Sequence, residues 1–220
     1  MNFQDNLVIL EGNIGAGKSY LLHEMTKCAP KAFSCLKEPV EQFCNLNNIY
    51  NPLKLGYESP FENVAITQLH ITDVMQTHYM DAIKNQSLTV PLVSERSPYS
   101  AHIFNDTYFE MGFYNAFVHE YISNKIQTSI TSLQLDADGP HKTIFVESTV
   151  ETCLQRIQYR NREEEQKVAF MASFLRRLQD QYNAHIDKLQ DKNKHVLRIT
   201  NNSAPSFMTI TKILDICHEN

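Results

Sequence analysis

The sequence lacks the features that would place the protein in a membrane, outside the cell or on a nucleic acid. No apolar run approaches the roughly 20 residues that are needed to span a bilayer. The first residues, MNFQDN, form neither the basic nor the apolar segment of a targeting peptide. Basic residues number 20 against 25 acidic ones, a net charge of −5, which disfavours a nucleic-acid polymer as the main partner. We therefore expect a soluble, cytoplasmic protein with no membrane and no nucleic-acid polymer as partner.

The cysteines also lack a recognisable pattern. They are five in number and form no C-x-x-C pair, which is typical of reduced thiols inside the cell. With 220 residues, of which 42% are hydrophobic, the chain is long enough for one α/β domain with a substantial core. We therefore predict a single domain over residues 1–220.

Short apolar runs alternate with longer stretches of helical period, and this alternation predicts a parallel sheet covered by helices. The predicted strands are 7–10, 33–36, 90–94, 143–146 and 195–199. The clearest predicted helix is 168–189, and a surface loop is predicted at 135–142. The apolar face of that helix is expected to consist of Met171, Phe174, Leu178, Tyr182, His185 and Leu189.

Glycine is scarce, yet three of the six glycines fall within the stretch LEGNIGAGKS at residues 10–19. This stretch fits the pattern G-x-x-x-x-G-K-[ST], with an apolar run before it and a helical run after it. A loop of this kind binds nucleotide phosphates with its backbone N–H groups, its lysine and the start of the helix, while the hydroxyl binds Mg²⁺. The alternative is a glycine-rich turn that fits by chance. The predicted phosphate-binding residues are Gly12, Asn13, Ile14, Gly15, Ala16, Gly17, Lys18 and Ser19.

Two further strands end in charged residues that should lie at the same edge of the sheet as this loop. Glu38 follows the second strand and precedes a proline, and its carboxylate is placed to accept the proton of an attacking hydroxyl. Glu95 and Arg96 follow the third strand, where an arginine can bind a substrate hydroxyl and a carboxylate can hold Mg²⁺. The alternatives are a solvent-exposed glutamate and an internal salt bridge.

A third charged stretch, QRIQYRNREEE, occupies residues 155–165. Arg156 and Arg160 share one face of a predicted helix, and Arg162 follows in the turn. Three guanidinium groups near a triphosphate would offset the charge of the moving phosphoryl group and of ADP. A solvated helix face paired with the glutamates at 163–165 is equally compatible with the sequence.

Taken in order, LEGNIGAGKS, EPVEQF, ERSPYSA and RIQYRNREEE resemble the deoxyribonucleoside kinase family, over residues 7–199. The resemblance implies a P-loop NTPase-type, three-layer α/β fold with a five-stranded parallel sheet, helices on both faces and an arginine-rich lid at 156–168. It also implies ATP as phosphoryl donor, Mg²⁺ as cofactor, a homodimer, and feedback inhibition by the end-product deoxynucleoside triphosphate.

Site roles follow from the resemblance position by position. Glu38 becomes the general base on the 5′-hydroxyl of a deoxynucleoside, and Arg96 contacts the same oxygen. Lys18, Arg156, Arg160 and Arg162 become phosphate ligands, whereas Ser19 and Glu95 serve Mg²⁺. Tyr57 and Glu165 take the sugar 3′-hydroxyl.

Base recognition is predicted for the helical stretch at 61–75, where an amide lies on an otherwise apolar stripe and must find a partner if it is buried. This stripe consists of Val64, Gln68, Ile71 and Met75. The resemblance implies that Gln68 pairs with the base edge, and Ala101, where the deoxycytidine kinase branch has an aspartate, leaves room for a 5-methyl group. Thymidine is therefore favoured, with deoxycytidine as a further substrate. The family's aromatic residues are replaced at the pocket positions Thr67 and Asn105.

Two other functions fit parts of the pattern. A nucleoside monophosphate kinase of the thymidylate type shares the phosphate loop and the acid–arginine pair, but Glu38 would repel a monophosphate acceptor. A catalytically silent nucleotide-binding subunit would keep the fold without needing Lys18, Glu38, Arg96 and Arg160 together.

Overall fold

The computed structural model describes residues 3–47, 49–85, 90–135, 140–165, 170–192, 194–202 and 207–218. A five-stranded sheet in the order β2-β3-β1-β4-β5 forms its centre, and every neighbouring pair of strands is parallel. The strands are β1 (Leu7–Glu11), β2 (Ser34–Leu36), β3 (Leu92–Glu95), β4 (Lys142–Glu147) and β5 (Val196–Thr200). All five predicted strands are confirmed, with ends that differ by one or two residues.

The strands were recognisable because helices cover both faces of the sheet, so that apolar residues follow one another without alternation. In β1 every residue is buried. Val8 and Leu10 join the apolar cluster that includes α1, whereas Leu7 and Ile9 join the cluster on the opposite face. β3 begins two residues later than predicted, after Pro91, which has no N–H to donate to a neighbouring strand.

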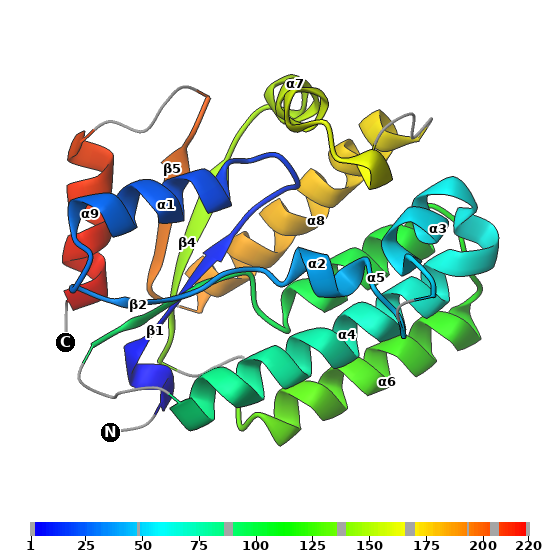
Figure 1. The fold of residues 1–220 in the computed structure, drawn as a ribbon, viewed down its shortest axis with the longest axis horizontal. Coiled ribbons are helices and arrows are strands. Elements are labelled where there is room, and N and C mark those ends of the chain that lie inside the picture. The colour runs from blue at the N-terminus through cyan, green and yellow to red at the C-terminus, as the bar shows by residue number, and fades with distance from the viewer. Residues whose placement is uncertain are drawn as a thin grey trace.

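The helices form two layers around this sheet. They are α1 (Lys18–Cys28), α2 (Val40–Phe43), α3 (Pro52–Glu58), α4 (Pro60–Asn85), α5 (Ser100–Glu110), α6 (Ala116–Ser132), α7 (Val150–Arg160), α8 (Met171–Asp191) and α9 (Phe207–His218), with short 3₁₀ turns η1 (Phe3–Asn6) and η2 (Glu163–Glu165). Helices α1 and α9 lie side by side at one side of the sheet, and α4 and α6 lie side by side at the other (Figure 1). No helix in the described ranges is long and apolar enough to cross a membrane.

Helix α8 largely matches the predicted helix at 168–189, although residues 166–169 lie outside the described residues. Five of the six residues predicted for its apolar stripe are buried, and Leu175 is buried in addition. His185 is only partly buried, and Ile186 takes its place in the core. The reason is geometric: Ile186 follows Tyr182 by four residues and precedes Leu189 by three, which keeps all of them on one helical face. The predicted loop at 135–142 also needs correction at its end, because Lys142 already belongs to β4, while 136–139 lie outside the described residues.

Candidate active site at the carboxyl ends of the strands

A cavity of about 930 Å³ opens at the edge of the sheet where β1, β2 and β3 end. It is lined by the loop between β1 and α1, the segment after β2, parts of α3, α4 and α5, and the lid residues of α7 and η2. The predicted site residues line this cavity except Gly12, Asn13 and Ala16, which belong to the same loop but are not among its described lining residues. Segments far apart in the sequence therefore contribute to one site.

The loop between β1 and α1 has the backbone that its glycines predict. Gly12 and Gly17 have φ values of +145° and +98°, which residues with a Cβ rarely adopt. A Cβ at Gly12 would lie 2.4 Å from the carbonyl oxygen of Val146, and one at Gly17 would lie 2.3 Å from Nδ2 of Asn201. Both positions thus favour glycine for two reasons: φ is positive, and a neighbouring atom lies too close to leave room for a Cβ.

Lys18 lies inside this loop and is 4% exposed. Its Nζ donates hydrogen bonds to the carbonyl oxygens of Gly12 and Asn13, each at 3.0 Å. Burial, together with the nearby charge of Arg96, lowers the pKa of Lys18 to about 8. Because burial disfavours an unpaired ammonium group, the negative charge of a triphosphate beside Lys18 would stabilise its charged form.

Ser19 and Glu95 meet at the start of α1, where Ser19 Oγ donates a 2.6 Å hydrogen bond to Glu95 Oε1. Mg²⁺ prefers oxygen ligands and, at nucleotide sites, takes one or two from the protein and the others from phosphates and water. This pair of oxygens fits that requirement. No group of three His, Cys, Asp or Glu side chains among the described residues could hold a metal ion by itself.

Glu38 and Arg96 form an ion pair at the centre of the cavity, with 2.8 Å between Glu38 Oε1 and Arg96 Nε. Burial alone would lower the pKa of Arg96, but the carboxylate of Glu38 and the other surrounding groups outweigh it and raise the pKa. Arg96 also lies over the ring of Phe104, with its Cζ 4.8 Å from the ring centroid. The arginine therefore remains charged beside the carboxylate.

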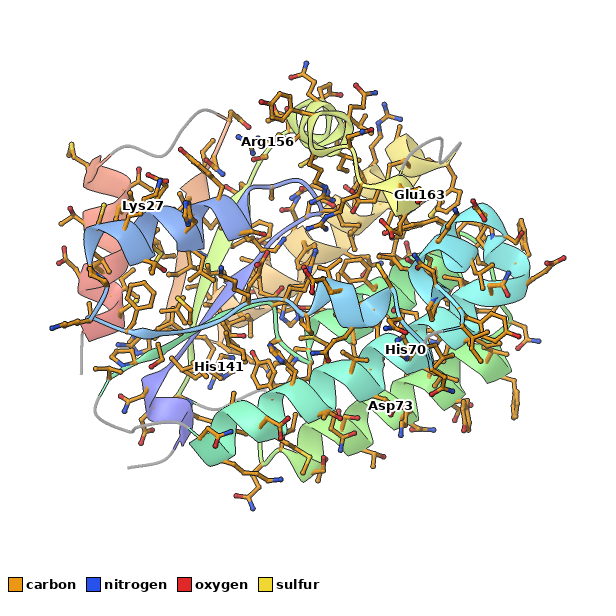
Figure 2. All side chains as sticks on the ribbon, viewed as in Figure 1. Lys27, His70, Asp73, His141, Arg156 and Glu163 are labelled. Atoms are coloured by element: carbon orange, nitrogen blue, oxygen red, sulfur yellow. The ribbon has the colours of Figure 1, made fainter. Side chains whose placement is uncertain are left out.

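Two histidines of α4 hold the segment that carries Glu38. Nε2 of His78 lies 2.8 Å from the carbonyl oxygen of Lys37, and Nε2 of His70 lies 2.9 Å from that of Gln42. Figure 2 shows His70 at the side of α4 that faces α2. The carboxylate is thus placed by hydrogen bonds at both ends of its segment.

The three predicted lid arginines have different partners. Arg156 donates to the carbonyl oxygens of Gly15, Ala16 and Asn201, at 3.3, 3.0 and 2.8 Å. It therefore extends from α7 to the phosphate loop, as Figure 2 shows. Arg160 forms a two-point ion pair with Glu165, one bond of which, from Nε, is 2.7 Å long. The remainder of the predicted lid, residues 166–168, lies outside the described residues.

Arg162 and the glutamates of η2 complete the lid. Arg162 Nη1 lies 3.8 Å from Glu165 Oε1. Glu163 pairs with Lys54 of α3, and Glu164 Oε1 accepts a 2.9 Å hydrogen bond from Nδ2 of Asn51. The lid is therefore joined to the segment that carries Tyr57.

The end of the cavity that α4 and α5 form carries apolar side chains and one buried amide. Gln68 is 2% exposed, and its Nε2 donates to no acceptor among the described residues. Ile71, Met75 and Ala101 line this end, while Val64 of the same predicted stripe is buried beneath it.

The sequence analysis missed several residues of this end. Phe104 and Tyr108 line the cavity, and their spacing of four on α5 was a usable signal. Thr67 instead donates to the carbonyl oxygen of Pro52, and Asn105 donates to Ser123 of α6. The two positions at which the family's aromatics are replaced thus join neighbouring helices.

Comparison with known proteins agrees with this arrangement. A protein-family model described as deoxynucleoside kinase matches residues 8–217, nearly the whole chain. The chain belongs to the deoxynucleoside kinase family. The resemblance predicted from the four sequence motifs is thereby confirmed.

The individual relatives are distant in sequence. A putative kinase, protein 143R of Invertebrate iridescent virus 6, is 26% identical over 80% of this chain and 80% of its own length. Deoxyguanosine kinase of Dictyostelium discoideum is 25% identical over 90% of this chain, which spans 64% of that protein. Human deoxycytidine kinase is 26% identical over 73% of this chain and 68% of its own length.

A solved structure of deoxyadenosine kinase from M. mycoides with bound dCTP has the same fold. The TM-score is 0.73 over 96% of this chain and 97% of that chain, at 18% sequence identity. The P-loop kinase fold predicted from the sequence is confirmed by this likeness and by the strand order.

Proposed function

We propose that this protein transfers the γ-phosphoryl group of ATP to the 5′-hydroxyl of a deoxynucleoside. The observation that carries the proposal is the ion pair between Glu38 and Arg96, which lies in the same cavity as Lys18 and Ser19 of the phosphate loop. A carboxylate beside a phosphate site suits an uncharged hydroxyl acceptor, because it would repel an acceptor that already carries a phosphate.

The reaction is an in-line displacement at the γ-phosphorus. The 5′-oxygen forms the new P–O bond, the bond to the β,γ-bridging oxygen breaks, and ADP leaves with that electron pair. Glu38 accepts the proton of the hydroxyl, and Arg96 holds the carboxylate and contacts the same oxygen. Lys18, Arg160 and Arg162 provide positive charge for the phosphoryl oxygens.

Arg156 supports the site in a second way. Its hydrogen bonds to the carbonyl oxygens of Gly15 and Ala16 hold the phosphate loop in place, so that the loop's N–H groups remain directed at phosphate. Ser19 and Glu95 would hold Mg²⁺, which supplies positive charge to the ATP phosphates when it is bound.

The sugar is proposed to lie between Tyr57 and Glu165. Both side chains are almost fully buried and line the cavity, at 6% exposed each. Burial raises the pKa of Tyr57 well above its ordinary value, and the charge of Glu165 adds to this effect. The phenol therefore remains a hydrogen-bond donor. A sugar without its 3′-hydroxyl would leave the buried Tyr57 hydroxyl without this partner, which costs about 1–3 kcal/mol, whereas Glu165 would keep its ion pair with Arg160.

The base is proposed to pair with Gln68. An amide can present donor and acceptor in either order, which suits the edges of both thymine and cytosine. Its buried Nε2, with no acceptor in the described part of the chain, supports a ligand partner at this position. Ala101 leaves room for the 5-methyl group, so we favour thymidine and include deoxycytidine.

Feedback regulation and assembly into a dimer are part of the same proposal. The cavity extends from Lys18 to Gln68, so an end-product triphosphate can occupy both ends and inhibit; dTTP should then compete with thymidine. The dCTP bound to the M. mycoides enzyme supports this proposal.

A homodimer is supported by large apolar side chains on α4 and α6 that are more than half exposed. Light scattering would measure the mass of the assembly in solution. These side chains are Phe61, Ile66, Phe117 and Tyr121.

The test is ADP release from ATP and Mg²⁺ with thymidine, deoxycytidine, deoxyguanosine, deoxyadenosine or thymidine monophosphate. We expect turnover led by thymidine, reduced about 100-fold or more in Glu38→Gln and unchanged in the exposed control Glu62→Gln. Turnover with thymidine monophosphate alone would move the protein to the monophosphate kinases. No turnover with any acceptor would favour a silent nucleotide-binding subunit.

A further inference from the structure

A buried carboxylate that the proposed reaction does not use lies behind the catalytic pair. Glu11, the last residue of β1, is 4% exposed. Its carboxylate accepts hydrogen bonds from Ser97 Oγ at 2.9 Å and from Ser100 Oγ at 2.6 Å. Burying a carboxylate costs several kcal/mol unless it is paired, so its partners indicate what it is for.

One further partner of Glu11 is the hydroxyl of Tyr182, which comes from α8. Tyr182 is fully buried, and its hydroxyl lies 3.3 Å from Glu11 Oε2. The same hydroxyl accepts a short hydrogen bond from Nη1 of Arg96. Burial and the charge of Glu11 raise the pKa of Tyr182 despite the opposing effect of Arg96, so the phenol stays protonated and can donate to Glu11 while it accepts from Arg96.

These bonds continue to the proposed general base. The guanidinium of Arg96 contacts Tyr182 through Nη1 and faces Glu38 through Nε, at 2.8 Å. A path of two hydrogen bonds and one ion pair thus runs from Glu11 through Tyr182 and Arg96 to Glu38. The two carboxylates lie at its two ends with the guanidinium between them, which is the arrangement that a buried positive charge requires.

The backbone of Arg96 is constrained as well. Its φ of +66° is uncommon for a residue with a side chain, and such a conformation persists only where the surroundings hold it. The N–H of Arg96 donates to the carbonyl oxygen of Leu10 at 3.0 Å, and its carbonyl oxygen accepts from the hydroxyl of Tyr79 at 2.8 Å. With the backbone held in this way, the remaining freedom is in the long side chain, where Tyr182 makes its bond.

We propose that Tyr182 and Glu11 are positioning residues for phosphoryl transfer, which hold the guanidinium of Arg96 against Glu38. This inference rests on the proposed kinase function for its catalytic consequence, but its structural part does not. Loss of the Tyr182 hydroxyl frees one side of the guanidinium, and Arg96 then spends less time in the geometry that the reaction needs.

The first experiment compares Tyr182→Phe with Tyr114→Phe. The matched control also removes one tyrosine hydroxyl, which donates to the carbonyl oxygen of Asn105 outside the cavity. Tyr182→Phe is expected to lower kcat about tenfold, the effect of roughly 1.4 kcal/mol, with KM for ATP changed less than about twofold. Tyr114→Phe should leave both constants near the wild-type values. Equal kcat in the two variants would overturn the proposal.

The second experiment does not depend on activity. The Nε–H signal of Arg96 in a ¹⁵N NMR spectrum, assigned by its absence in Arg96→Lys, should be protected from hydrogen exchange in the wild type. Protection should fall at least about tenfold in Tyr182→Phe and in Glu11→Gln, and remain in Tyr114→Phe. If protection is unchanged in both site variants, the positioning role is wrong, whatever the acceptor assays show. If protection falls but no nucleoside is phosphorylated, the proposed function fails while the network stands.

Discussion

Lys18 is expected to make the protein less stable in the absence of nucleotide, although phosphate binding needs it. Burial, with the charge of Arg96, lowers its pKa from the ordinary value of 10.5 to about 8. A difference of roughly 2.5 pKa units between the unfolded and folded states corresponds to about 3 kcal/mol of lost stability at pH 7. Lys18→Met removes the charge and keeps an unbranched side chain that is only one atom shorter, so it should recover part of this free energy.

The dependence on pH is the decisive part of the prediction. Between pH 8 and 10.5 the unfolded chain binds a proton at Lys18 that the folded protein does not, so the wild type gains stability as pH rises. Lys18→Met lacks this gain. Its advantage in the free energy of unfolding should therefore shrink by about 2 kcal/mol from pH 7.5 to 9.5. The variant also loses the two hydrogen bonds of Nζ, but a neutral amine keeps these, so their loss does not change the slope.

The assay is urea unfolding without nucleotide at both pH values, under reducing conditions because the described cysteines are free. Lys27→Met is the control. A hydrogen bond to Glu24 raises the pKa of the exposed Lys27, so it is protonated in both states throughout this range and its removal should have the same effect at both pH values. An advantage of Lys18→Met that is equal at pH 7.5 and 9.5 would refute the reasoning.

Two further pairs of variants separate general from local effects. Gly17→Ala and Gly112→Ala both place a Cβ at positive φ, which costs about 1–2 kcal/mol. Only the Cβ of Gly17→Ala would also clash with a neighbour, because it would lie 2.3 Å from Nδ2 of Asn201. Calorimetric titration should show loss of ATP binding in Gly17→Ala alone; weak binding by both variants would point to a global effect. Asn51→Ala and Asn115→Ala each remove a helix cap worth about 1 kcal/mol, but only Asn51 also holds the lid. Initial rates should show a raised KM for the deoxynucleoside in Asn51→Ala only, and an equal rise in both would contradict a role for that lid contact.

The sheet could be predicted because its chemistry is local and repetitive. A buried parallel strand such as β1 appears in the sequence as a run of apolar residues, and the phosphate loop has fixed spacing between its glycines and Lys18. Spacing could not show that Ile186 is buried in place of His185, since the two residues lie on adjacent parts of the same helical face. The choice between neighbours depends on how the helix is rotated against the sheet.

Long-range contacts explain most of what the sequence did not show at the site. Tyr182 was predicted as a core residue, which is true of its ring, but periodicity does not reveal where its hydroxyl points. Glu11 is part of the phosphate-loop stretch, yet no spacing rule connects it with Ser100 on α5. Arg156 and Arg160 share a helical face, but one turn of α7 separates an arginine bonded to the phosphate loop from one bonded to Glu165.

The central claim is that an uncharged deoxynucleoside, and not a monophosphate, accepts the phosphoryl group beside Glu38. The most direct measurement is chromatographic analysis of one reaction that contains ATP, Mg²⁺ and equal amounts of the four deoxynucleosides and thymidine monophosphate. We predict that thymidine is consumed first and deoxycytidine after it, each with an equal gain of its monophosphate, and that both are consumed about 100-fold or more slowly with Glu38→Gln. Formation of thymidine diphosphate while all four deoxynucleosides remain unchanged would contradict the account.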